Sequence, residues 1–200
     1  MGLDIDGEGE GDESGRSISL SSDGRKIAIG SWKNSGCGTL RGQVRLFEYV
    51  ANTWMQIGNI LGENDTDYFG YSVSLSSNGL IVAAGAVRES GDGYVEVYEF
   101  DGNLWNKLGE RIEGRTDSDQ FGFAISLSSN GQRLAISAPT YDDGPEATNA
   151  GFVEIYEFMN SSWAPLGDFI VGKNQADEFG NSISLSGEFS NSHIRIWYKL

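Results

Sequence analysis

The chain has 200 residues, of which 12% are aromatic and 28 are glycine, and its formal net charge is −15. This composition indicates a folded domain rich in strands and turns, and it argues against a disordered segment. The acidic balance argues against nucleic acid and anionic membrane surfaces as partners, because both require a basic face.

The first segment, Leu3 to Asp6, has the pattern of a strand that ends a repeat, and acidic residues crowd it and the loop that follows. They are Asp4, Asp6, Glu8, Glu10, Asp12 and Glu13. A rim that attracts cations is one interpretation, but a solvated loop that keeps the protein soluble is favoured. The N-terminus lacks the basic-then-apolar pattern of a secretion signal.

From Asp12 onward, one short segment occurs four times. The copies read DESGRSISLSSDG from Asp12, DYFGYSVSLSSNG from Asp67, DQFGFAISLSSNG from Asp119 and DEFGNSISLSGEF from Asp177. The glycine at the fourth position of each copy recurs after 55, 52 and 58 residues, at Gly15, Gly70, Gly122 and Gly180. This period is too long for helical-pair repeats and fits a four-stranded blade of a β-propeller.

Each repeat predicts four short strands. The first alternates apolar and polar residues around Ile18, Val73, Ile125 and Ile183. Tight hairpins are expected at 23–24, 78–79 and 130–131. Each of these positions holds an Asp-Gly or Asn-Gly pair, and both residues of such a pair tolerate positive φ. The second strand is apolar on both faces and is expected at the centre of a sheet, over 26–30, 81–85 and 134–137. The third is expected over 43–49, 94–100 and 152–158, and the fourth begins at Trp54, Trp105 and Trp163.

The predicted fold class is therefore all-β, a β-propeller of four-stranded antiparallel blades. A single domain over residues 1–200 is expected to hold a partial blade at 1–13, blades at about 14–66, 67–118 and 119–176, and a partial blade at 177–200. The two ends either leave the propeller incomplete or combine into a fourth blade. The incomplete form is favoured because residues 187–200 lack two good strand patterns, and its open sheet edges would then favour self-association.

The repeated motif resembles the FG-GAP repeat, which builds the β-propeller of integrin α subunits. Phe69-Gly70, Phe121-Gly122 and Phe179-Gly180 match its FG half, and Gly85-Ala86 and Ala138-Pro139 match its GAP half. The resemblance implies an extracellular or cell-surface protein that binds another protein or a glycan. Two sequons, at Asn64 and Asn160, would be relevant to such a location.

No metal site and no cofactor are expected. The integrin-type repeat holds calcium in a carboxylate-rich loop between its first two strands, and a hard cation needs several oxygen ligands. Here that place holds only the short segments Ser21 to Gly24, Ser76 to Gly79 and Ser128 to Gly131. A two-residue hairpin is too short to surround a calcium ion, so the metal sites of the family do not carry over.

The residues that recur in every repeat are expected to build the repeat. The aspartates should fix a turn by accepting backbone N–H groups, the phenylalanines should wedge between blades, and the glycines should let backbones approach. Aromatic residues at repeat spacing are more often packed in a core than stacked on a ligand. This structural signature comprises Asp67, Phe69, Gly70, Asp119, Phe121, Gly122, Asp177, Phe179, Gly180, Trp54, Trp105 and Trp163.

Enzyme signatures are sparse. His193 is the single histidine and Cys37 the single cysteine, so neither a Ser-His-Asp nor a Cys-His arrangement has a good candidate. Asp142, Asp143 and Glu146 form the one acidic cluster without counterparts in other repeats, and a solvated loop is favoured there. The expectation is a non-enzymatic binding or structural module. The alternative is a fragment of a carbohydrate-active or other hydrolytic propeller, which would need a unique pair of carboxylates in a pocket.

Overall fold

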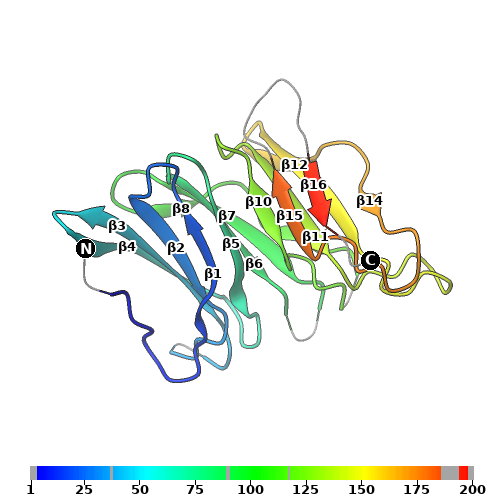
Figure 1. Ribbon diagram of the computed structural model, residues 1–200, viewed down its shortest axis with the longest axis horizontal. Coiled ribbons are helices and arrows are strands. Elements are labelled where there is room, and N and C mark those ends of the chain that lie inside the picture. Colours follow the sequence, from blue (N-terminus) through cyan, green and yellow to red (C-terminus); the bar gives the residue numbers. More distant parts are fainter. Residues whose placement is uncertain (1–3, 37, 89–90, 117, 186–193, 198–200) are drawn as a thin grey trace.

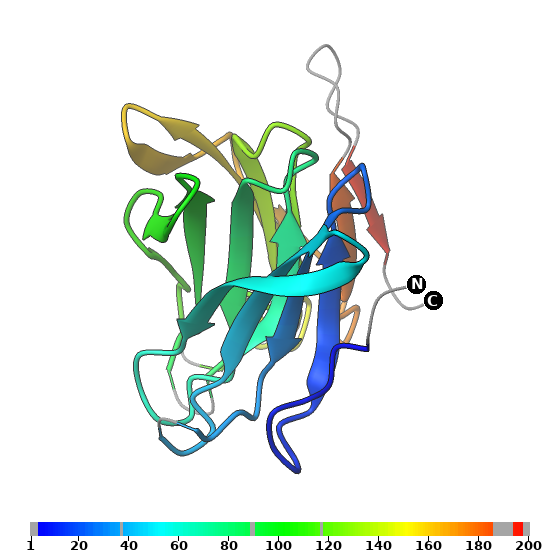
Figure 2. The same cartoon turned by 90° about the vertical axis from the view of Figure 1, so that its left-hand side faces the viewer.

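A computed structural model describes residues 4–36, 38–88, 91–116, 118–185 and 194–197, the last range as backbone only. It is all-β: no helix occurs in the described residues, and three antiparallel sheets of four or five strands follow one another along the chain. Figure 1 shows these sheets arranged along the long axis of the molecule, and Figure 2 views them from the end that carries the first sheet. The expectations for Leu3, Cys37, His193 and most of the tail at 187–200 lie outside the described residues.

Each sheet uses strands that are consecutive in the sequence. The first sheet contains β1 (Ser14–Leu20), β2 (Lys26–Ser31), β3 (Gln43–Val50) and β4 (Thr53–Leu61). The second contains β5 (Phe69–Leu75), β6 (Ile81–Ala86), β7 (Tyr94–Phe100), β8 (Trp105–Lys107) and β9 (Ile112–Glu113). The third contains β10 (Ile125–Leu127), β11 (Arg133–Ala138), β12 (Phe152–Met159), β13 (Ser162–Pro165) and β14 (Ile170–Val171), and a terminal hairpin follows with β15 (Ser182–Leu185) and β16 (Ile194–Trp197).

The first three strands of each sheet confirm the sequence-based prediction, whereas the fourth differs. In the first sheet it is one continuous strand, β4. In the second and third sheets it is split into two short pieces that pair with the same third strand. The splits coincide with Gly109 and Gly167, whose φ angles of 79° and 78° lie in the left-handed region and interrupt an extended strand.

The hairpins between the first and second strands form as expected, but only the glycine of each pair takes a positive φ. The φ angles of Gly24, Gly79 and Gly131 are 69°, 65° and 72°. The residue before each glycine uses its side chain instead: Asp23 accepts the Arg25 N–H at 2.9 Å. These carboxylate and amide oxygens thus stabilise the turn itself.

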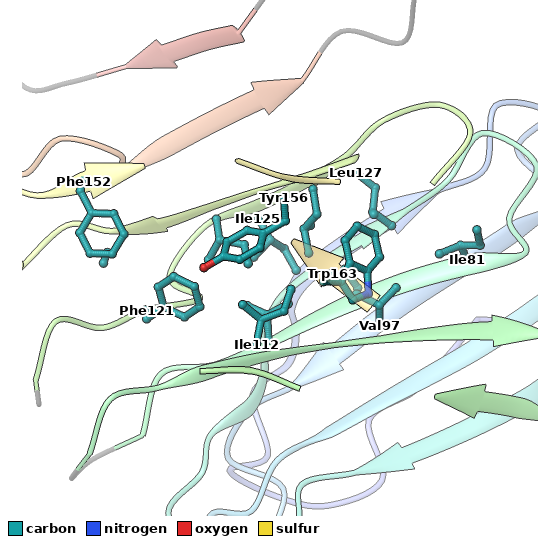
Figure 3. Close-up of a cluster of buried hydrophobic side chains, with 14 residues drawn as sticks. Ile81, Val97, Ile112, Phe121, Ile125, Leu127, Phe152, Tyr156 and Trp163 are labelled. Carbon is teal, nitrogen blue, oxygen red and sulfur yellow. The ribbon is translucent and has the colours of Figure 1, made fainter. Parts of the chain in front are cut away.

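Apolar residues of neighbouring sheets form the cores between them. Phe69 is fully buried with Val44 and Leu46 of the first sheet, and Phe121 is fully buried with Val95 of the second. Figure 3 shows Phe121 near Phe152, with ring centroids 6.1 Å apart, and Trp163 farther along the same buried cluster. The phenylalanine of the repeat therefore sits where one sheet meets the next.

Within the described part of the chain, no helix is long and apolar enough to cross a membrane.

Candidate functional site

The recurrent aspartates lie in the loops that connect one sheet to the next. Asp67 and Asp119 are 2% and 4% exposed, and Asp177 is partly buried. Asp67 accepts the Asn64 N–H at 2.9 Å, and Asp177 accepts the N–H groups of Lys173 and Asn174. These bonds fix the connecting loop.

The recurrent aromatic residues occupy structural places as well. Phe69 and Phe121 are fully buried, whereas Phe179 is partly buried. Trp163 is buried and donates its indole N–H to the Leu108 carbonyl at 2.8 Å. Trp54 and Trp105 are partly buried and pack on Tyr49 and Phe100. Gly70, Gly122 and Gly180 all have positive φ, as the motif requires.

A pocket of about 300 Å³ opens beside the first sheet. The loop before β1, the loop after β2 and the paired strands β3 and β4 supply its walls. Its polar lining contains two carboxylates, three amides and one hydroxyl, from Glu8, Asp12, Asn34, Gln43, Asn59 and Ser35. Acceptors and donors therefore converge on one concave surface, as in sites that bind small polar molecules.

The pocket exists because the first sheet departs from the repeat. Gln43, the first residue of β3, donates to the side-chain oxygen of Asn59 at 2.9 Å. At the matching places, the second sheet has Tyr94 with Arg111 lying 3.9 Å from its ring centre, and the third has a pair of aromatic rings, Phe152 and Phe169. The bulky pairs fill this place in the second and third sheets, whereas two small amides leave it open in the first.

Hydrogen bonds hold the two carboxylates of the pocket in place. Glu8 accepts from Gln43 at 2.9 Å and lies 3.8 Å from the guanidinium of Arg45. Asp12 is 8% exposed and accepts from the Asn34 amide at 2.8 Å. Glu8 has a side chain that is 46% exposed, so it is the carboxylate that faces solvent.

β3 buries two polar side chains, Gln43 and Arg45. The Arg45 guanidinium is buried and donates to the Asp6 carbonyl and the Ser14 hydroxyl at 2.7 and 3.1 Å. Two buried polar atoms, Gln43 Oε1 and Arg45 Nε, have no hydrogen-bond partner among the described residues. An unpaired buried polar atom costs about 1–3 kcal/mol. Packing alone therefore does not explain why these two polar side chains are buried. Such departures from good packing are expected where a sequence is selected for function.

A row of aromatic side chains begins with Trp32, just after β2, and continues through residues of the second and third repeats. Trp32 packs on Tyr68 and Tyr71, with ring centroids 5.1 and 5.4 Å away, and Tyr71 in turn contacts Phe123 at 5.3 Å. All four side chains are partly exposed. Such rings present flat apolar faces with polar edges to a ligand.

Glu13 connects this row to the acidic loop. Its carboxylate accepts a hydrogen bond from the Trp32 indole N–H at 2.7 Å and forms an ion pair with Lys33. The hydrogen bond from Lys33, together with that from Trp32, holds the pKa of the Glu13 carboxyl below its ordinary value. Glu13 is therefore ionised at neutral pH and orients the indole ring.

The other acidic residues singled out in the sequence do not assemble into a site. Asp142, Asp143 and Glu146 lie in an exposed or partly exposed loop, where Asp142 accepts the Asn149 N–H at 2.6 Å. Among the described residues, no group of three or more His, Cys, Asp or Glu side chains is arranged to hold a metal ion.

Sequence reasoning missed Asn34, Gln43 and Asn59. It treated the acidic loop as solvated charge, because acids alone carry no evidence of a cavity. The sequence did contain one indication of the pocket. At the start of the third strand, glutamine replaces the aromatic residue of the other repeats.

Comparisons with known proteins show the fold and little else. No family model and no curated protein matches the chain. Among solved structures, the crystal structure of a proposed 6-phosphogluconolactonase from Bacteroides fragilis matches with a TM-score of 0.55 at 14% sequence identity. The match covers 80% of this chain and 39% of that chain, so this chain spans less than half of the neighbour's length.

This similarity corrects the expectation of a non-enzymatic module. That expectation was drawn from the absence of histidine and cysteine arrangements, and it treated the repeated all-β fold as a scaffold without chemistry. The neighbour carries the same fold and is described as a lactonase, so the fold does not speak against an enzyme. The pocket beside the first sheet is lined by residues that differ from those of the other repeats. A purely structural array does not require such a difference.

Proposed function

We propose that the chain is part of a hydrolytic β-propeller, with the three sheets as its blades, and that the pocket beside the first sheet binds a sugar-type substrate. The observation that carries this proposal is the replacement of a bulky pair by Gln43 and Asn59. It opens a pocket beside the first sheet with Glu8 and Asp12 in its wall. The lactonase-like fold of the neighbour supports the proposal.

The substrate class follows from the polarity of the lining. Amides donate and accept hydrogen bonds and carboxylates accept them, so the lining suits the hydroxyl groups of a sugar. A phosphorylated substrate would need cations, yet the lining holds two carboxylates and no basic residue. We therefore propose a neutral polyhydroxylated ester, such as an unphosphorylated sugar lactone.

Glu8 is the proposed general base. Its partly exposed carboxylate is oriented by Gln43 and Arg45, so it can accept a proton from a water molecule. The oxygen of that water attacks the lactone carbonyl, the bond between the carbonyl carbon and the ring oxygen breaks, and the ring oxygen takes up a proton. Asp12 and Asn34 are proposed to bind substrate hydroxyls.

The test compares two substrates and two variants. Hydrolysis of glucono-δ-lactone and of its 6-phosphate is followed by acid release, with the uncatalysed rate subtracted. The wild-type chain is expected to hydrolyse the neutral lactone preferentially. Glu8→Gln should reduce turnover by roughly 10²–10⁴-fold, the usual contribution of a general base. The matched control is Glu110→Gln, an exposed glutamate outside the pocket, which should keep full activity.

Three results would contradict the proposal. No hydrolysis of either lactone by the folded wild-type chain would remove the hydrolytic function. Equal rates for wild type and Glu8→Gln would show that the pocket does not carry the chemistry, and faster turnover of the 6-phosphate would overturn the proposed substrate class.

A further inference from the structure

The buried aspartate of the second repeat has a cation and a phenol as partners. Asp67 accepts hydrogen bonds from the Arg88 guanidinium at 3.1 Å and from the Tyr94 hydroxyl at 2.8 Å. A carboxylate that is removed from water needs partners of this kind, because an unpaired buried charge is strongly unfavourable. The second repeat therefore compensates the charge of its aspartate within its own fold.

The matching aspartate of the first repeat, Asp12, has no such cation. Lys33 stands at the place of Arg88, two residues after the end of the second strand, but its ammonium group pairs with Glu13 at 2.5 Å. Asp12 is 8% exposed and accepts a hydrogen bond from the Asn34 amide at 2.8 Å. Among the residues that the structure describes, no lysine or arginine forms an ion pair with Asp12. One buried carboxylate of the pocket is therefore left without a countercharge.

Gln43 adds an acceptor without a partner to the lining of the same pocket. Its side chain is 2% exposed, and its NH₂ group donates to Glu8 and to Asn59, both at 2.9 Å. These two acceptors identify the nitrogen end of the amide. The other end, Oε1, is buried and has no hydrogen-bond partner among the described residues. A ligand that donates a hydrogen bond to this oxygen removes an unfavourable contribution to the free energy.

Hydrogen-bond donors are scarce in the lining. The NH₂ group of Gln43 uses both of its hydrogens inside the protein. The Asn34 amide donates to Asp12, and the Ser35 hydroxyl donates to a backbone carbonyl at 3.2 Å. The lining contains no basic residue. A ligand therefore meets mainly acceptor oxygens and negative charge, which an ammonium group matches with three N–H donors and no acceptor.

We propose that the pocket binds amino sugars, with their ammonium group held by the Asp12 carboxylate and Gln43 Oε1, and that it prefers them to neutral sugars of the same shape. The place of the site rests on the proposed function, and its ligands are extended here from neutral sugars to amino sugars. Glu8 keeps its role as the proposed base. The formal charge of −15 also raises the local concentration of cationic ligands.

The test compares two ligands that differ in one group. Sorbitol and 1-amino-1-deoxysorbitol have the same length, and one hydroxyl is replaced by an amine that is protonated at about pH 7. Calorimetric titration of the wild-type chain should show that the amine binds more tightly by roughly 10- to 100-fold, the range for a hydrogen bond to a charged group. The N-acetylated amine, which has no charge, should bind no better than sorbitol. Butylamine, which has the charge but no hydroxyl group, should bind more weakly than the amino sugar alcohol.

Asp12→Asn is the variant that tests the contact. It removes the charge at constant size, so the two ligands should then bind equally. Glu110→Gln is the matched control, because it removes one exposed carboxylate outside the pocket and should leave the preference unchanged. Circular dichroism verifies that both variants are folded. The comparison of the free and the acetylated amine on the wild-type chain tests the charge without any substitution.

Equal binding of sorbitol and 1-amino-1-deoxysorbitol by the wild-type chain would overturn the inference. So would a preference that persists in Asp12→Asn, or butylamine binding as tightly as the amino sugar alcohol. Binding is measured without turnover, so the inference and the proposed function fail separately. A chain that prefers the amine but hydrolyses no lactone supports the inference and contradicts the hydrolytic function, and lactone hydrolysis without this preference does the reverse.

Discussion

Across the β3–β4 pair, the Gln43 amide donates to the Asn59 side-chain oxygen at 2.9 Å, and this bond stands where the other sheets place bulky side chains. In the second sheet the corresponding contact is Arg111 over Tyr94, 3.9 Å from the ring centre. The pocket beside the first sheet therefore depends on two small polar residues, and its filling can be tested directly.

Gln43→Tyr is expected to close the pocket while the chain stays folded, because the second sheet accepts tyrosine at the same place. A misplaced or excluded substrate loses roughly 100-fold in rate. Lactone hydrolysis and thermal unfolding measure the two effects. The control is Gln56→Tyr, which adds the same ring at an exposed position of β4. Full activity of Gln43→Tyr would show that the pocket is not the site.

Phe121→Ala is expected to lower the free energy of unfolding by about 3–5 kcal/mol, the usual range for truncating a buried aromatic residue. Phe121 is fully buried and lies 6.1 Å from the Phe152 ring. Urea unfolding followed by tryptophan fluorescence gives the difference. Phe123→Ala, two residues away and partly exposed, should cost clearly less. A loss below about 1 kcal/mol for Phe121→Ala would show that the ring does not wedge the sheets together.

The buried charge in the middle of the third strand differs between sheets: it is Arg45 in the first, Glu96 in the second and Glu154 in the third. The third sheet buries Glu154, which pairs with Arg115 from the preceding loop, whereas the first buries Arg45, which faces Glu8 from its own preceding loop. The exchange Arg115→Glu with Glu154→Arg should therefore be better tolerated than either single change. A double-mutant cycle by urea unfolding should give a favourable coupling of about 0.5–3 kcal/mol. If the effects of the two single changes simply add, Arg115 and Glu154 do not interact.

Glu63 is expected to make the free energy of unfolding depend on pH in the acidic range. The hydrogen bond from Lys107, supported by Arg111, holds the pKa of the Glu63 carboxyl below its ordinary value of 4.5 against the opposing effect of burial. Because the unfolded chain takes up this proton first, the stabilisation is complete above pH 4.5 and is lost as the pH falls through the folded pKa. Unfolding of Glu63→Gln between pH 3 and 6, about the range of carboxyl titration, should show a shallower acid decline. A steeper decline in Glu63→Gln would reverse the assigned sign.

Local residue patterns were enough to predict the all-β class and the order of the strands. Alternation of apolar and polar residues around Val73 and Ile125, followed by Asn-Gly turns, specifies strands and hairpins locally, because these preferences act over a few residues. The fully buried Phe69 and Phe121 also follow from their spacing, since a repeat must bury the same residue at each junction.

The polar residues of the pocket come together only in the folded chain. Glu8, Asn34 and Asn59 come from three separate segments, and no local pattern relates them. Their meeting depends on how two loops cross the ends of β3 and β4. The exposure of Ile18 and Leu20 was equally hidden, because their alternation matches that of the buried pairs. Local sequence sets which face of a strand is apolar, but the presence or absence of a neighbouring sheet decides whether that face is buried.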